Sequence, residues 1–387
     1  MSTTWVMAVA LAVVGAVAAC SSSVGPGGAT TGGDGEPGSS SGSASGSGSG
    51  DAGSPSSGGS ASGSGSGGAT GSGSTDGSSG TPGPDASSYD AGSGAGSGTL
   101  VLFGGWNGSV CLNDTWTFDG TRWTQAPVSK PPPIRANASM ATFGSGIVLF
   151  GGSIFQNGVF QFLNDTWMFD GTTWTRVSSS SSPPARDSAT MAKLGSNVVL
   201  YGGWNGSDLL GDTWTFDGTT WTEVTPTGGP GERQYASMAT RGNHVELFGG
   251  VDSNKDILND TWAFNGSIWT NLTTANAPAT RELSSMATLG SNVLLFGGVG
   301  SWNGVILLND TWTFDGSSWT QPSAPSPPSA RDSASMATSG SEVVLFGGFD
   351  GLDYRNDTWT FDGTGWTQVI VPTSPPARDS STLAALP

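Results

Sequence analysis

The chain has 387 residues, with 16 tryptophans, 63 glycines and a formal net charge of −17. From residue 99 onward, 13 basic and 24 acidic residues leave a net charge of −11, which argues against nucleic acid as a partner. Eleven of these acids occupy two fixed positions of an internal repeat, so we interpret the acidity as solvation of the surface.

Residues 1–20 are predicted to be a lipoprotein signal peptide. Residues 5–19 form an unbroken apolar run that is too short to span a bilayer comfortably and is typical of a secretory signal. The sequence V-A-A-C at residues 17–20 resembles the bacterial lipobox, which implies lipidation of Cys20 and a membrane contact through that lipid alone. Ser21 after the cysteine favours the outer membrane. The alternative is an ordinary cleaved signal and a secreted protein.

Residues 21–98 are predicted to be a disordered linker. They consist almost wholly of Gly, Ser, Ala, Thr, Pro and Asp, with Tyr89 as the only aromatic residue. Such a composition cannot bury enough apolar surface to offset the chain entropy lost on folding. A flexible Gly/Ser coil of this length has a root-mean-square span of roughly 50 Å, which would hold a folded domain clear of a membrane.

Residues 99–387 contain six copies of one unit, which we predict to be the fold. Each copy carries a Gly-Gly pair, an Asp-Thr-Trp triplet, a second tryptophan and an arginine, in the same order. The glycine pairs recur every 47 to 51 residues, and they begin at Gly104, Gly151, Gly202, Gly249, Gly297 and Gly347.

Four short strands are predicted in each unit, as the last copy illustrates. Residues 335–338 (S-M-A-T) are small, and residues 343–346 (V-V-L-F) are continuously apolar, as in a strand covered on both faces. Residues 358–361 (T-W-T-F) alternate at period two, and an Asp-Gly hairpin turn leads to a fourth strand through Trp366. The unit is therefore predicted to be a four-stranded antiparallel meander.

Blades that converge on a central axis leave room only for small side chains near the axis and need large ones at the rim. The first strand of each unit has small residues and the last two have tryptophans, so we predict an all-β, six-bladed β-propeller. The pattern L-F-G-G, N-D-T-W-T-F-D, Trp and P-P-A-R resembles the kelch repeat found in galactose oxidase-like propellers. The resemblance implies closure by a blade shared between the chain ends. Residues 100–103 form a second strand with no first strand before it, and residues 378–384 form a first strand with no second after it. We expect the C-terminal strand to complete blade one.

We expect no enzyme activity, cofactor or metal ion. Copper chemistry of the galactose oxidase type needs histidine and tyrosine ligands, whereas His244 is the chain's one histidine. Residues 215–221 resemble the Asp box of sialidases but are one residue short, and no arginine triad stands apart from the repeat. The aspartates of the Asp-Thr-Trp triplets are expected to make structural hydrogen bonds.

The loops between the second and third strands depart from the repeat, and we predict that they form a ligand-binding face. They should emerge on the side where the arginines enter the innermost strands. Aromatic and arginine side chains are common in binding surfaces. The candidate ligand-binding residues are Trp106, Trp204, Trp302, Phe349, Tyr354, Arg135, Arg186, Arg233, Arg281, Arg331 and Arg378. For the arginines alone, we favour a structural pairing with Asp187, Asp332 or Asp379.

The function predicted from these patterns is that of an exported, lipid-anchored, monomeric protein-interaction scaffold in the cell envelope. The alternatives are a carbohydrate-binding module, in which the Trp loops stack on a polysaccharide, and a sialidase-like enzyme.

Overall fold

The computed structural model describes residues 98–156, 159–274, 276–301 and 305–387. The predicted signal peptide with Cys20, nearly all of the predicted linker and Trp302 lie outside these residues. Among the described residues, no helix has the length and apolar character that crossing a membrane requires.

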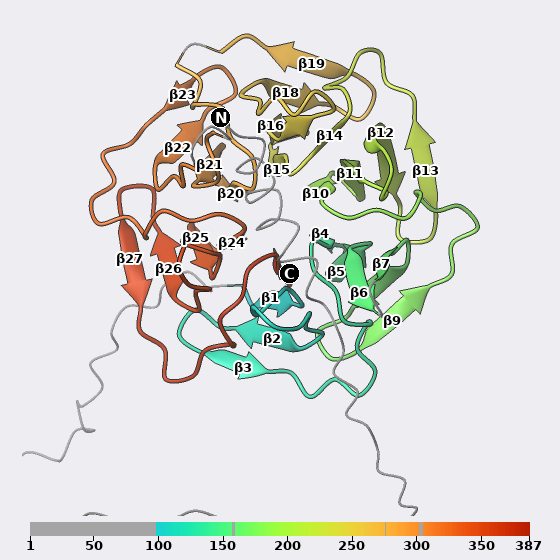
Figure 1. The fold of residues 1–387 in the computed structure, drawn as a ribbon, viewed down its shortest axis with the longest axis horizontal. Helices are drawn as coiled ribbons and strands as arrows, with labels where there is room; N and C mark the ends of the chain where they lie inside the picture. The colour runs from blue at the N-terminus through green and yellow to red at the C-terminus, as the bar shows by residue number, and fades with distance from the viewer. Residues whose placement is uncertain (1–97, 157–158, 275, 302–304) are drawn as a thin grey trace, which may run out of the picture. The chain divides into compact units, whose positions relative to one another are not determined.

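Six four-stranded antiparallel sheets are arranged radially around a central axis, as Figure 1 shows. The innermost strands are β28 (Thr382–Ala385), β4 (Ser139–Phe143), β10 (Thr190–Leu194), β15 (Ser237–Arg241), β20 (Ser285–Leu289) and β24 (Ser335–Ser339). The second strands, from blade one to blade six, are β1 (Leu100–Phe103), β5 (Gly146–Phe150), β11 (Asn197–Trp204), β16 (His244–Phe248), β21 (Asn292–Phe296) and β25 (Glu342–Phe346).

The outer half of each blade follows the predicted order. The third strands are β2 (Thr115–Phe118), β8 (Thr166–Phe169), β12 (Leu209–Phe216), β18 (Thr261–Phe264), β22 (Thr311–Phe314) and β26 (Thr358–Phe361). The outermost strands are β3 (Trp123–Gln125), β9 (Trp174–Val177), β13 (Trp221–Val224), β19 (Trp269–Leu272), β23 (Trp319–Thr320) and β27 (Trp366–Val369). Two small ladders add β6 (Ser153–Gln156) with β7 (Val159–Phe162), and β14 (Arg233–Gln234) with β17 (Val251–Asp252).

The hydrophobic core lies between neighbouring blades. In β1, Leu100 and Leu102 pack toward blade six, in a cluster that includes Phe346. Val101 and Phe103 point the other way and pack toward blade two, in a cluster that includes Leu149. Successive side chains of a strand face opposite sides of the sheet, so a strand with a neighbouring blade on each side must be apolar at every position. This explains the unbroken apolar run in each second strand.

The predicted closure of the ring is confirmed. Strand β28 pairs antiparallel with β1, with Leu383 opposite Leu102 and Ala384 opposite Val101. The first blade thus takes its innermost strand from the C-terminus, and the two ends of the propeller are joined by a full strand ladder.

Candidate functional site

Each repeat arginine joins two blades. The backbone of Arg135 binds blade one, because its N–H donates to the Leu112 carbonyl and its carbonyl accepts from the Gly105 N–H. Its guanidinium reaches into blade two, where it donates to the Gly151 carbonyl at 2.8 Å and to both carboxylate oxygens of Asp165 at 2.7 and 2.8 Å. A bidentate pair of this kind fixes both the distance and the orientation of its partners.

The same pair occurs in all six blades, with nitrogen–oxygen distances of 2.5 to 2.9 Å. The pairs are Arg135 with Asp165, Arg186 with Asp212, Arg233 with Asp260, Arg281 with Asp310, Arg331 with Asp357, and Arg378 with Asp114.

The tryptophans of the repeat complete this network. The indole N–H of Trp167 donates to Asp165 at 2.6 Å, so one carboxylate binds both an arginine and the tryptophan two residues later. The outer tryptophan, Trp174, donates to the Thr115 hydroxyl of the preceding blade at 3.0 Å. Equivalent bonds occur in every blade. The structural hydrogen bonds expected of the aspartates are therefore confirmed.

The arginines differ from their predicted position on a ligand-binding face. All six are buried, with at most 3% of the residue exposed, and are bound to carboxylates. Arg135, Arg186, Arg233, Arg281, Arg331 and Arg378 are thus not accessible to an outside ligand. The structural role favoured for the arginines is confirmed, but the predicted partners Asp187, Asp332 and Asp379 are wrong, because the guanidinium groups bind the Asp-Thr-Trp aspartates that precede the third strands.

The loops between second and third strands do gather beside the segments that follow the arginines. Trp106 forms a backbone bridge with Asp379, Trp204 with Asp187, and Phe349 with Asp332. In blade four the same contact is the short ladder between β14 and β17. We call the surface formed by these six loops the loop face.

Two of the predicted aromatic residues brace adjacent blades. Trp106 is only 1% exposed, and its indole N–H donates to the Tyr354 hydroxyl of blade six at 3.1 Å. Trp204 is half-buried and packs edge-on against Phe162 of blade two, with ring centroids 5.2 Å apart. Each of these two tryptophans begins a W-N-G sequence whose glycine permits the contact, because a Cβ atom on Gly108 or Gly206 would lie within 3.0 Å of the neighbouring ring. The W-N-G sequences of blades one and three therefore connect each of these loops to the loop of a neighbouring blade.

Phe349 and Tyr354 lie together in blade six, both half-buried, with ring centroids 5.1 Å apart. The large hydrophobic residues that the loops expose are instead aliphatic: Val159 (66%), Val305 (47%), Ile306 (55%) and Leu352 (86%). Sequence reasoning missed them because it searched the loops for aromatic and charged side chains.

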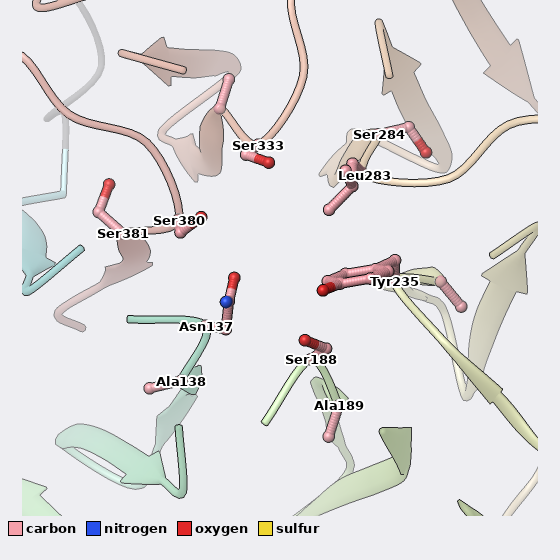
Figure 2. A pocket seen from close by; sticks show the side chains of 12 residues that line it. Asn137, Ala138, Ser188, Ala189, Tyr235, Leu283, Ser284, Ser333, Ser380 and Ser381 are labelled. Atoms are coloured by element: carbon pink, nitrogen blue, oxygen red, sulfur yellow. The ribbon is translucent and has the colours of Figure 1, made fainter. Parts of the chain in front are cut away.

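The axis carries a second feature that the sequence analysis missed. Two residues after each arginine, the backbone takes a positive φ of 50 to 58° and donates its N–H to the equivalent carbonyl of the preceding blade. Six such bonds close a ring around a cavity of about 160 Å³, shown in Figure 2. The ring residues are Asn137, Ser188, Tyr235, Leu283, Ser333 and Ser380. Their side chains vary between repeats, and only their spacing from the arginine could have located them.

Buried carboxyl groups stand immediately before four of the ring residues. Burial raises the pKa of Asp187 to about 6 and that of Asp332 to about 6. Burial, together with the charge of Asp332, raises the pKa of Glu282 to about 8 and holds that of Asp379 well above its usual value. Within the described residues, no group of three or more His, Cys, Asp or Glu side chains is placed to hold a metal ion.

The carboxylates of the arginine pairs behave in the opposite way. Burial would raise the pKa of Asp165, but the hydrogen bonds and charge of Arg135 outweigh it and hold the pKa below its usual value. The same balance lowers the pKa of Asp212, Asp310 and Asp357.

We predict that Arg135→Ala lowers the free energy of unfolding by about 3–5 kcal/mol, because it leaves Asp165 partly buried without its counter-charge. Urea denaturation measures this change. Arg122→Ala is the matched control, since Arg122 and Asp119 form a pair with side chains 68% and 45% exposed, and we expect a change within about 0.5 kcal/mol. Equal effects of the two substitutions would show that the buried pair is not a structural joint.

We also predict that stability falls as the pH rises from about 4 to about 8. The pKa of Glu282 is raised from 4.5 to about 8, and those of Asp187 and Asp332 from 3.8 to about 6. In this range the folded state binds more protons than the unfolded state, so the free energy of unfolding decreases with pH. Below about pH 4 the free energy of unfolding should instead decrease as the pH falls, because Asp165 and its equivalents have a lowered pKa in the folded state.

Thermal melts across this pH range measure the effect. Glu282→Gln should flatten the profile and raise the melting temperature above pH 7, whereas Asp208→Asn, on an exposed loop residue, should leave the profile as it is. A melting temperature of the unmodified protein that rises steadily from pH 4 to pH 8 would contradict the prediction.

Comparison with known families agrees with this architecture. The model for the KLHDC2/KLHL20/DRC7 Kelch-repeats domain matches residues 95–298. The comparison with curated proteins gave no match. The matched residues cover more than half of the chain and include the Asp-Thr-Trp triplets of blades one to four together with Arg135, Arg186, Arg233 and Arg281. The chain therefore belongs to the kelch-repeat family of β-propellers.

Proposed function

We propose that this protein is a non-enzymatic interaction scaffold that binds a protein partner through its loop face. The observation that carries the proposal is the group of exposed aliphatic side chains on three loops: Val159 on blade two, Val305 and Ile306 on blade five, and Leu352 on blade six. Aliphatic side chains exposed on a rigid scaffold lose little conformational entropy on binding. Their burial against a partner contributes a favourable hydrophobic free energy. Kelch propellers commonly bind proteins, which agrees with this function.

Two observations weigh against the alternatives. Stacking on a sugar requires an exposed flat ring, whereas Trp106 is buried and Trp204 is half-buried against Phe162. A sialidase-like enzyme requires several arginines free to bind a carboxylate substrate, and the six repeat arginines already bind aspartates of the protein. We therefore favour a protein over a polysaccharide as the partner.

Two isoleucines, one on the loop face and one on the opposite face of the propeller, give a matched test. Ile306 of blade five is 55% exposed on the loop face. Ile268 of blade four is 46% exposed beside a hairpin turn on the opposite face. With a photo-reactive amino acid at one of these positions in the full-length protein, irradiated intact cells should yield a discrete cross-linked protein from position 306. Position 268 should give none.

The cross-link should be lost when Leu352→Asp is added, because a carboxylate on the exposed loop of blade six would have to be desolvated against the partner. Cross-links of equal yield from positions 306 and 268, or a product that survives Leu352→Asp, would overturn the assignment of the loop face. Binding of the purified protein to a polysaccharide array, with no cross-linked protein, would favour the carbohydrate alternative.

We further propose that the propeller is exported and anchored through a lipid on Cys20, with residues 21–98 as the tether. The support is the V-A-A-C sequence at residues 17–20 after an apolar run. Cys20→Ser should move the protein from the membrane fraction to a soluble fraction and abolish labelling with radioactive palmitate. Retention in the membrane fraction without labelling would mean that another segment holds the protein there.

A further inference from the structure

We propose that the cavity on the propeller axis binds a primary ammonium group, presented by a lysine side chain of the protein partner. The residues around the axis form the site, and only the source of the ammonium group rests on the function proposed above.

The wall of the cavity is built from hydrogen-bonding side chains. Figure 2 shows Ser188, Ser333, Ser380 and the Tyr235 hydroxyl with their oxygen atoms toward the axis, together with the amide of Asn137. The volume of about 160 Å³ is enough for several water molecules. A short alkylammonium ion is of this size.

The serine hydroxyls are disposed to accept hydrogen bonds from a ligand. Ser188 donates its one hydroxyl proton to the Asp187 carboxylate at 3.0 Å and is also hydrogen-bonded to the Tyr235 phenol, so one of its two lone pairs can accept from Tyr235 and the other from a donor in the cavity. Hydrogen bonds from Ser333 and Ser380 likewise lower the pKa of Asp332 and Asp379, against the larger effect of burial. Three Asp-Ser dipeptides on three different blades therefore present three acceptors, and an ammonium group carries three N–H donors.

Buried carboxyl oxygens without partners supply a second and independent observation. Glu282 is 1% exposed, and both of its carboxyl oxygens lack a hydrogen-bond partner among the described residues, as does Oδ1 of Asp379. A buried acid group is stable only when it is paired, or when it is protonated and hydrogen-bonded. The nearby repeat arginines do not pair with these acids, since they bind the Asp-Thr-Trp aspartates.

Asp187, Glu282, Asp332 and Asp379 each stand immediately before a ring residue, next to the residues that line the cavity. After burial, which is the largest effect, the charges of Asp187, Glu282 and Asp379 raise the pKa of the Tyr235 phenol, whose oxygen points into the cavity. Where these acids are ionised, their charge disfavours an anionic ligand and favours a cation, and a bound cation in turn lowers their pKa. The acids stand behind the hydroxyls, and no described cluster is arranged to hold a metal ion, which favours an organic cation with N–H donors.

Calorimetric titration of the full-length protein with n-butylammonium chloride tests the site. The titration is run above pH 8, where Glu282, with its pKa of about 8, is mostly ionised. We expect saturable binding, no binding of tetramethylammonium, which has the charge but no N–H donor, and no effect of sodium chloride at the same ionic strength.

Matched variants locate the binding. Asp379→Asn and Ser380→Ala should each weaken n-butylammonium binding at least tenfold, whereas Ser207→Ala, on an exposed loop residue, should leave it unchanged. Each variant is first checked for an unchanged near-ultraviolet circular dichroism spectrum. If Asp379→Asn disturbs the fold, Ser380→Ala, which removes only a hydroxyl group, still tests the site. Equal binding by tetramethylammonium, or equal affinities of the three variants, would overturn the proposal.

The source of the ammonium group is tested separately. If a lysine of the partner occupies the cavity, n-butylammonium should compete with the cross-link from position 306, and Ser380→Ala should reduce that cross-link. Binding of n-butylammonium without competition would overturn the lysine and leave a site for a free amine. A cross-link from position 306 in a protein that does not bind n-butylammonium would overturn this inference and leave the proposed function standing.

Discussion

The fold depends on a buried ion pair repeated six times. Each arginine binds one blade through its backbone and the next through its guanidinium, so no blade can move without breaking bidentate hydrogen bonds in a partly dry environment. The pair in blade one spans the ends of the chain, because Arg378 reaches Asp114. Closure therefore uses the same interaction as every other joint between blades.

This use of the arginines determines which surfaces remain for binding. Charged and aromatic residues of the repeat pair with one another inside the blades, so they cannot also recognise a ligand. The binding proposed for this protein therefore depends on residues that the repeat does not constrain. These are the loop tips, where Ile306 and Leu352 are exposed, and the ring at the axis, where Ser188 and Tyr235 face the cavity.

Much of the fold could be predicted from the sequence because a period near 48 residues, repeated six times, specifies strand order and closure together. The site could not be predicted in the same way. Asp187 is the sequence neighbour of Arg186, but Arg186 binds Asp212, which only the path of the second and third strands brings close. Trp106 was expected at the surface, yet it is covered by Tyr354, which lies 248 residues later in the chain. Both errors arose from contacts between segments that are distant in sequence.

The ring at the axis combines one backbone conformation with side chains that differ from repeat to repeat. Non-glycine residues with positive φ are uncommon, and a conformation of this kind costs about 1–3 kcal/mol. Here the closed ring of backbone hydrogen bonds imposes it on residues as different as Tyr235, Leu283 and Ser333. Because the backbone alone makes those bonds, the side chains are free to differ. A change of side chain at the ring would alter the chemical groups that line the cavity, while the backbone hydrogen bonds of the ring are retained.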